Sequence, residues 1–133
     1  MSAPRSLPLI LVVDDSPAAR EEVARLLEPD YRCTFAHNGV EALKKIFIEQ
    51  PAAVVTDIEM PMMDGIQFLR AIRADPRTSR LPVVVMTTST SLDAFNRARA
   101  FGSSGVVSKP VDRDYLLSKL ASLLREKPTG EKG

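Results

Sequence analysis

The sequence of 133 residues contains one cysteine, one histidine and no apolar run near the length of a membrane span. Cys33 has no partner for an intrachain disulfide, and its apolar neighbours predict a buried, reduced thiol. The apolar segment 7–13 ends at Asp14-Asp15 with no small-residue cleavage site, which argues against a signal peptide. Crossing a bilayer takes roughly 20 apolar residues. We therefore expect a cytoplasmic protein with no membrane partner.

The charge is nearly balanced overall but unevenly distributed. Residues 1–66 carry 6 lysines and arginines against 11 acidic residues, whereas residues 67–133 carry 12 against 6. A basic half can meet an acidic partner or nucleic acid. However, no aromatic or glycine-rich nucleic-acid motif interrupts these basic residues. Solvated helix faces explain the charges better, and we expect no direct nucleic-acid binding.

Five short apolar runs predict β-strands in a chain whose length fits one domain. Three of them lack polar alternation, which is typical of strands buried on both faces of a parallel sheet. Longer segments with helical spacing separate the strands. This alternation indicates an α/β fold, with right-handed crossovers and helices on both faces of an open sheet. The predicted strands cover Leu9–Val13, Cys33–Ala36, Ala53–Thr56, Val83–Thr87 and Val106–Val107.

Capping residues and apolar stripes predict five helices. The first begins with Ser16 as N-cap and Pro17 at the first helical position. The second starts near Asn38, the third runs from about Gly65 to Asp75-Pro76, the fourth covers about 91–101 before Gly102, and the fifth opens at Asp112. The apolar stripes contain Val23, Leu26 and Leu27, then Val40, Leu43 and Phe47, then Phe68, Leu69 and Ile72, and finally Leu116, Leu117, Leu120 and Leu124.

Chemically useful side chains follow four of the predicted strands. Asp14-Asp15 follow the first strand, Asp57 the third, Thr87-Thr88 end the fourth, and Lys109-Pro110 come just after the fifth. In open parallel sheets the working site lies beyond the carboxyl ends of the strands. Carboxylates packed this closely demand a cation, and without histidine or thiol ligands they suit a hard ion such as Mg²⁺. The histidine, His37, is expected to be a surface loop residue.

This set of residues predicts phosphoryl chemistry. A carboxylate beside Mg²⁺ can attack a phosphoryl group and form an acyl phosphate, while a hydroxyl and an ammonium stabilise the transferring oxygens. Asp57 is the best nucleophile because it ends a central strand between the other contributors. Each residue alone has an ordinary explanation, since Asp14-Asp15 can cap a helix and Lys109 can be a surface charge. Their occurrence together at corresponding strand ends has no such ordinary explanation.

Four ordered segments carry a resemblance to a known family. The segments LILVVDDS, VVTDIEMPMMDG, LPVVVMTTS and GVVSKP resemble those of CheY-like response regulator receiver domains from two-component signal transduction. The resemblance implies a single-domain (βα)5 flavodoxin-like fold over residues 7–125, with a five-stranded parallel sheet of order 2-1-3-4-5. Residues 1–6 are then an N-terminal extension and residues 126–133 a flexible tail.

The resemblance also implies roles for individual residues. Mg²⁺ would be held by the side chains of Asp14, Asp15 and Asp57 and by the backbone carbonyl of Glu59. Asp57 would be the phosphoacceptor, Thr87 the switch hydroxyl and Lys109 the cation that pairs with the phosphoryl group. Pro110 would follow a cis peptide bond. Of the residues after Asp57, Met60, Met62 and Met63 can contact a partner, and at least one is expected to pack under the loop.

The implied function is a switch that accepts a phosphoryl group from a sensor histidine kinase or a phosphotransfer protein. The phosphorylated state would change the binding of a downstream target protein or output domain through the face of the fourth helix, fifth strand and fifth helix. No enzyme activity is expected beyond Mg²⁺-dependent self-phosphorylation and self-dephosphorylation. Basic residues on or near this face, which can meet the partner or simply be solvated, are Arg97, Arg99, Arg113 and Lys119.

One departure from the family concerns switching. Val106 stands where receivers often carry Tyr or Phe, so the usual aromatic rearrangement is absent and output must use backbone and helix shifts. Glu59 and Ser89 lie two positions beyond Asp57 and Thr87, where family members tune the lifetime of the phosphorylated state, and they do not predict that lifetime.

Three alternatives remain open at the level of sequence. The chain can be an unphosphorylated interaction scaffold, which Val106 slightly favours. It can be a receiver cut from a longer response regulator or hybrid kinase with an output domain. A Mg²⁺ phosphohydrolase fits less well, because such enzymes commonly carry the nucleophile after the first strand with a second Asp two residues on, where this chain has Ile58-Glu59.

Overall fold

Five parallel strands form one sheet in the order β2-β1-β3-β4-β5 in the computed structural model, which describes residues 7–88 and 92–125. The α/β fold and the strand order expected from the resemblance are therefore confirmed. The strands are β1 (Leu9–Val13), β2 (Arg32–Ala36), β3 (Ala53–Asp57), β4 (Val83–Thr87) and β5 (Gly105–Ser108). The predicted bounds are correct for β1 and β4, and the other three strands extend by one or two residues.

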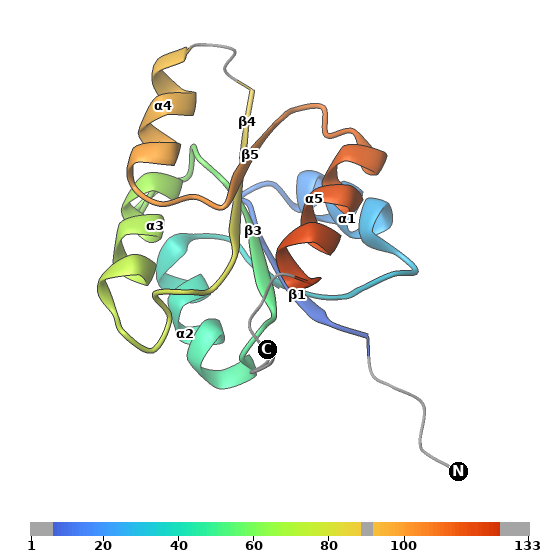
Figure 1. Cartoon of the computed structure of the whole chain (residues 1–133), viewed down its shortest axis with the longest axis horizontal. Helices are drawn as coiled ribbons and strands as arrows, with labels where there is room; N and C mark the ends of the chain where they lie inside the picture. Colours follow the sequence, from blue (N-terminus) through green and yellow to red (C-terminus); the bar gives the residue numbers. More distant parts are fainter. Residues whose placement is uncertain (1–6, 89–91, 126–133) are drawn as a thin grey trace.

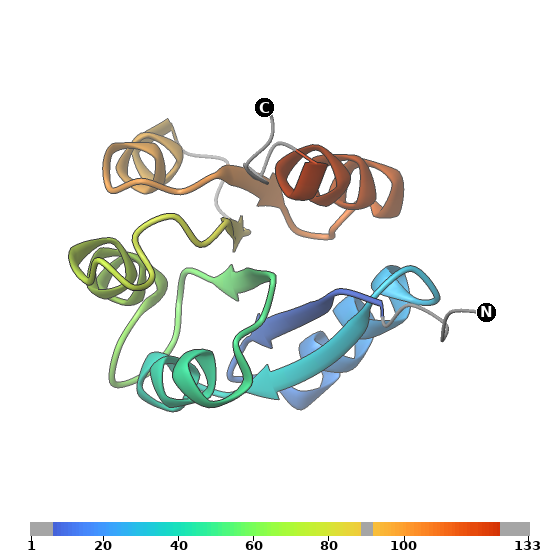
Figure 2. The same cartoon turned by 60° about the horizontal axis from the view of Figure 1, so that its bottom comes forward.

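Five helices cover the two faces of the sheet (Figures 1 and 2). They are α1 (Pro17–Leu27), α2 (Gly39–Glu49), α3 (Gly65–Ala74), α4 (Leu92–Ala100) and α5 (Arg113–Arg125). Helices α2, α3 and α4 lie on one face, and α1 and α5 lie on the other. No helix in the described ranges is long and apolar enough to cross a membrane. The predictions for residues 1–6, for Ser89 and Ser91, and for the tail lie outside the described residues.

Capping fixes where the helices begin, as the sequence predicts. Ser16 Oγ accepts a 3.2 Å hydrogen bond from the Ala19 amide, and Asn38 Oδ1 accepts one of 2.8 Å from Glu41. Asp64 and Gln67 form a reciprocal capping box at α3. Gly102, after α4, has a φ of +98°, the left-handed conformation that glycine adopts without steric penalty. These helix starts place the loops that follow β1 and β3 at the carboxyl edge of the sheet.

Two apolar cores hold the helices to the sheet. Strands β1, β3 and β4 are buried almost throughout, so their alternate side chains point into different cores. Phe68, Leu69 and Ile72 of α3 are fully buried on one side, and Leu116 and Leu120 of α5 on the other. Each such side chain contributes about 1.5–3 kcal/mol by leaving water. The carboxyl edge therefore rests on a rigid support.

The predicted inner face of α2 is wrong at two of its three positions. Val40 and Phe47 are 38% and 40% exposed, whereas Ala42 and Ile46 are buried. Leu43, the third predicted residue, is partly buried and packs against the core. Gly39 lies against the Met63 side chain of the loop after β3. The buried face of α2 is therefore centred on Ala42 and Ile46, and Val40 and Phe47 lie outside it. In the other helices the expected apolar stripes are confirmed, although Leu26, Leu117 and Leu124 are only partly buried. Cys33, which was expected to be buried, is also only partly buried.

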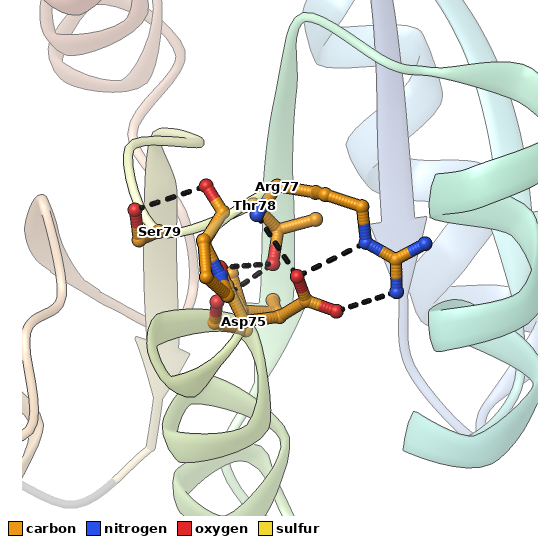
Figure 3. Close-up of polar contacts among 6 residues, drawn as sticks. Asp75, Arg77, Thr78 and Ser79 are labelled. Atoms are coloured by element: carbon orange, nitrogen blue, oxygen red, sulfur yellow. Dashed lines mark hydrogen bonds and ion pairs between the residues drawn. The ribbon is translucent and has the colours of Figure 1, made fainter.

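Arg73 ties two loops together at the far end of α3. Its guanidinium donates to the carbonyl oxygens of Leu81 (2.7 Å), Gly102 (2.9 Å) and Ser79 (3.2 Å). In the same loop, the Arg77 guanidinium pairs with the Asp75 carboxylate on the surface (Figure 3). Arg73 therefore joins the connection between α3 and β4 to the turn after α4, whereas Arg77 makes exposed contacts, with Asp75 and with the Phe47 ring of α2.

Candidate functional site

The carboxyl edge of the sheet brings together the side chains that the sequence singled out. Asp57 is the last residue of β3 and Thr87 the last of β4, while Asp14 and Lys109 directly follow β1 and β5. Backbone hydrogen bonds extend the sheet to these positions: Asp14 N donates to Ala36 O (3.1 Å), and Lys109 N donates to Thr87 O (2.9 Å). Their placement therefore follows from strand register.

Three carboxylates form a cluster at this edge. Asp14, Asp15 and Asp57 each offer an oxygen, and these oxygens lie within 4.8 Å of one another. Opposite ligands of an octahedral Mg²⁺ ion are about 4.2 Å apart, since each bond is about 2.1 Å long. Small side-chain rotations would therefore bring this set to the ion, and the exposure of Asp15 leaves room for the water ligands that Mg²⁺ retains. The donor set fits Mg²⁺.

Local contacts fix Asp14, which is only 1% exposed. Its Oδ1 accepts a 3.0 Å hydrogen bond from the Ser16 amide, and its carbonyl oxygen accepts one of 2.7 Å from Arg20 Nη1. Its other carboxylate oxygen, Oδ2, accepts from Lys109 Nζ at 2.9 Å. Asp14 is thus held by the start of α1 on one side and by the loop after β5 on the other.

Lys109 also links two of the carboxylates. Its Nζ lies 3.2 Å from Asp57 Oδ1. Burial raises the pKa of Asp57, the Lys109 charge opposes this rise, and the Asp14 charge adds to it. Burial acts to lower the pKa of Lys109, but its hydrogen bonds to the two carboxylates and their charges outweigh burial, so this pKa is raised. Lys109 is consequently a firmly protonated cation between two acids that repel one another.

An open cleft of about 550 Å³ lies beside the carboxylates. Thr87, which is 4% exposed, reaches it from β4, and Glu59 and Asp64 line it from the segment after β3. Its other lining residues are Asp15, Ile58, Met60, Pro61, Ala94 and Arg97. The cleft leaves this edge of the sheet open to molecules from solution. Metal ligation by the Glu59 backbone carbonyl stays a prediction, as do the individual roles of Asp14, Asp15, Asp57, Thr87 and Lys109.

Two features of the site were not foreseen. The pairing of Lys109 with Asp14 was missed because the family resemblance implies that this lysine contacts a phosphoryl group, and says nothing of a contact with an acid. Arg97 was expected near the output face, yet it lines the cleft. The sequence carried no signal for this: although Ala94 and Arg97 are three residues apart and share one face of α4, this spacing does not say which face turns toward the cleft.

Other predictions near the site are confirmed. The Lys109-Pro110 peptide bond is cis, and a second cis bond, Glu28-Pro29, was not foreseen. His37 is exposed in the loop after β2, bonded to Glu41. Met60 is buried, and Met63 packs against the core beneath the loop.

Comparison with known proteins gives consistent results. Residues 10–121 match the model of a family described as the response regulator receiver domain. The chain is 37% identical over 136 aligned positions to the response regulator Rre1 of Synechocystis, covering 100% of this chain and 58% of that protein. The solved structure of the chemotaxis response regulator CheY4 of Vibrio cholerae superposes with a TM-score of 0.80 at 30% identity, covering 89% of this chain and 99% of that one.

A third comparison concerns the receiver domain of the sensor histidine kinase PA1611 from Pseudomonas aeruginosa, solved with a magnesium ion coordinated in its active site cleft. It superposes with a TM-score of 0.83 at 24% identity, over 90% of this chain and 99% of that one, and so supports the fold alone. This chain spans about half the length of the curated relatives that it matches.

Proposed function

Because this chain belongs to the response regulator receiver domain family, we propose that it is a signalling switch in which Asp57 accepts a phosphoryl group. The observation that carries the proposal is the gathering of Asp14, Asp15 and Asp57 beside Thr87 and Lys109 at one edge of the sheet. Mg²⁺ would be held by the three aspartates and by the Glu59 carbonyl, in line with the magnesium named for the PA1611 receiver.

The chemical step transfers a phosphoryl group between two nucleophiles. An Asp57 carboxylate oxygen forms the new bond to phosphorus while the bond from phosphorus to the donor breaks, and the electron pair leaves with the donor. Bound Mg²⁺ would supply positive charge that offsets the charge of the transferring oxygens. Lys109 then exchanges its contact with the Asp57 carboxylate for one with the phosphoryl oxygens, and the Thr87 hydroxyl donates to another. Attack of water on the same phosphorus reverses the modification.

The donor would be a sensor histidine kinase or a phosphotransfer protein, because family members serve two-component signalling. Beyond its own phosphorylation and dephosphorylation the chain would catalyse nothing. It would work in the cytoplasm, where its kinase would phosphorylate it. A phosphohydrolase is disfavoured because Asp57 ends β3, and Ile58-Glu59 supplies no second aspartate.

The output would pass through the face formed by α4, β5 and α5. A recess of about 200 Å³ there is lined by Phe95, Tyr115 and Val106, with Arg99 and Lys119 among the other lining residues. Val106 is 9% exposed and lacks a ring that can swing inward. Movement of Thr87 toward the phosphoryl group would therefore act through the β4–α4 connection and shift α4. The target can be a separate protein or an output domain on a longer chain.

Intact mass spectrometry tests the proposal. The protein is incubated with Mg²⁺ and acetyl phosphate, and a mass increase of one phosphoryl group is expected. Asp57→Asn should abolish the adduct, and Asp30→Asn, at an exposed position away from the site, should leave it unchanged. Without a wild-type adduct, the alternative of an interaction scaffold that is never phosphorylated, which Val106 favours, would replace this function.

A pull-down identifies the state-dependent partner. Wild-type protein loaded with Mg²⁺ and beryllofluoride, which stands in for the phosphoryl group, is compared with the untreated protein. A partner retained only by the loaded form supports a switch. Equal retention by both forms contradicts it.

A further inference from the structure

The cleft beside Asp57 is strongly acidic. Asp15, Glu59 and Asp64 line it, and Asp15 belongs to the same carboxylate cluster as Asp14 and Asp57. Donors of phosphoryl groups are anions, and a cleft lined by one sign of charge repels ions of that sign. Lys109 offers little relief to an incoming anion, because its ammonium already contacts two carboxylates.

Arg97 is the one basic residue among those that line this cleft in the described part of the chain. It lies on α4, and Ala94, one turn earlier on the same helix face, also lines the cleft. Thr87 lines the same cleft, so Arg97 and Thr87 face a common space. Within residues 7–88 and 92–125, the Arg97 side chain is exposed and makes no ion pair with a carboxylate.

We propose that Arg97 is a positioning residue for the phosphoryl donor, with its guanidinium binding the donor's phosphate oxygens in the cleft and directing the phosphorus toward Asp57. This inference rests on the proposed function. The ligand class is a small or protein-borne phosphoryl anion, such as an acyl phosphate or a phosphoramidate. A planar guanidinium suits such an anion because its N–H groups match two phosphate oxygens at once.

The same charge has a second, opposite consequence. Arg97 and Mg²⁺ are both cations at the edge of the aspartate cluster, so Arg97 disfavours metal binding while it favours anion binding. Loss of the charge should therefore slow the reaction with an anionic donor and tighten the binding of Mg²⁺. Damage to the fold would weaken both processes.

The test compares the full chain with Arg97→Gln, Arg97→Lys and Arg99→Gln. Arg99 is the matched control, because it is an exposed arginine of the same helix that lines the recess on the output face instead. Phosphorylation rates are measured by intact mass at several concentrations of acetyl phosphate, a dianion, and of phosphoramidate, which carries less charge. The Mg²⁺ dissociation constant is measured by titration calorimetry without donor.

Arg97→Gln is expected to lower the second-order rate with acetyl phosphate about fivefold at low salt. The loss should be smaller with phosphoramidate and smaller at high salt, which screens exposed charges. Arg97→Lys should keep most of the rate, and Arg99→Gln should keep all of it. The Mg²⁺ dissociation constant should fall about twofold in Arg97→Gln.

Three results would overturn the inference: equal rates in Arg97→Gln and the wild type, equal losses in Arg97→Gln and Arg99→Gln, or weakened Mg²⁺ binding in Arg97→Gln. In each case the wild type still forms the adduct, so the proposed function survives. A wild type that forms no adduct at all overturns the proposed function itself and, with it, the role of Arg97.

Discussion

Lys109 and Asp14 are 95 positions apart in the sequence, and the Lys109 ammonium donates a 2.9 Å hydrogen bond to the nearly inaccessible Asp14 carboxylate. The ammonium is thereby hydrogen-bonded to a carboxylate that the proposed Mg²⁺ ion would also need as a ligand. On the proposed function, metal and lysine would compete for Asp14 in the resting protein. A phosphoryl group on Asp57 would offer the lysine another partner.

Replacing this lysine should separate metal binding from phosphorylation. In Lys109→Gln we expect Mg²⁺ to bind about tenfold more tightly, because a charged hydrogen bond to Asp14 no longer has to be broken. Phosphorylation by acetyl phosphate should nevertheless become much slower, because the cation that contacts the phosphoryl oxygens is lost. Calorimetry and intact mass measure the two effects, with Lys119→Gln on α5 as control. Weaker Mg²⁺ binding in Lys109→Gln would contradict this competition.

The raised pKa of Asp57 predicts a pH-dependent cost to the metal-free fold. Burial, with the Asp14 charge adding to it, raises the pKa against the opposing Lys109 charge, so the folded state binds this proton more tightly than the unfolded state does. The free energy of unfolding should therefore fall as pH rises from the ordinary aspartate value, about 3.9, through the raised value. Asp57→Asn removes the group and should be more stable than the wild type at neutral pH.

Urea unfolding in EDTA at a series of pH values tests this effect. The advantage of Asp57→Asn should shrink as the pH is lowered. Added Mg²⁺ should stabilise the wild type by about 2.7 kcal/mol at a hundred times the dissociation constant. It should stabilise the variant less. An advantage of Asp57→Asn that does not depend on pH would show that shape, not charge, is responsible.

Gly65 is required by the close approach of α3 to the end of β3. A Cβ there would overlap the Asp57 carbonyl oxygen and lie 2.7 Å from Ile58 Cα, both of which are backbone atoms. Gly65→Ala should therefore cost about 1–3 kcal/mol and slow the proposed phosphorylation, because the end of β3 that carries Asp57 must move. Gly39→Ala is the matched control, since its Cβ would meet only the flexible Met63 side chain. Similar losses in both variants would contradict the argument.

Arg73 should matter far more for stability than Arg77, four residues later. Arg73→Met removes the hydrogen bonds to the carbonyl oxygens of Ser79, Leu81 and Gly102 and should cost about 2–4 kcal/mol. Arg77→Met loses an exposed pair with Asp75 and a contact 4.4 Å above the Phe47 ring, so its effect should be much smaller. Urea unfolding compares the two, and the reverse order would refute this assignment.

The Cys33 thiol should be unreactive at neutral pH. Burial, with the Glu28 charge adding to it, raises the pKa of this thiol to about 11. Because the thiolate is the reactive form, the rate of alkylation by iodoacetamide should keep rising with pH up to about 11. The protein unfolded in urea serves as control and should show a midpoint near the ordinary value, about 8.5. A folded midpoint near 8.5 would show that the thiol is accessible.

The sheet was predictable because its strands are short, mostly apolar runs, three of which lack polar alternation. The cap at Ser16-Pro17 and the glycine at 102 predicted helix boundaries that the structure confirms. The face of α2 was predicted only in part, because apolar residues occur all around this helix. Val40, Leu43, Ile46, Phe47 and Ile48 offer more than one apolar stripe, and the sequence does not show that Ala42 and Ile46 are the buried pair.

The site was predictable in position but not in its contacts. Register brings Asp14 and Asp57 to one edge once the strands are parallel, so strand ends alone locate the cluster. The ion pair of Lys109 with Asp14 depends on where a long, flexible side chain settles between two acids. The position of Arg97 depends on how α4 is rotated about its axis. The sequence does not specify this rotation, because α4 is only weakly apolar and neither of its sides stands out as the buried one.

The two ends of the described fold offer a practical handle. Leu9 begins β1 and pairs with Arg32 of β2. Arg125, in the last turn of α5, lies close enough to Tyr31 that its charge opposes the rise in the pKa of the Tyr31 hydroxyl caused by burial. Both therefore lie at the amino edge of the sheet, and a five-residue strand of about 16 Å separates this edge from the aspartates. Anchoring the molecule to a sensor chip by either of these two ends would leave the carboxyl edge of the sheet facing the solution. A dye attached at either end would report binding at the carboxyl edge without blocking it.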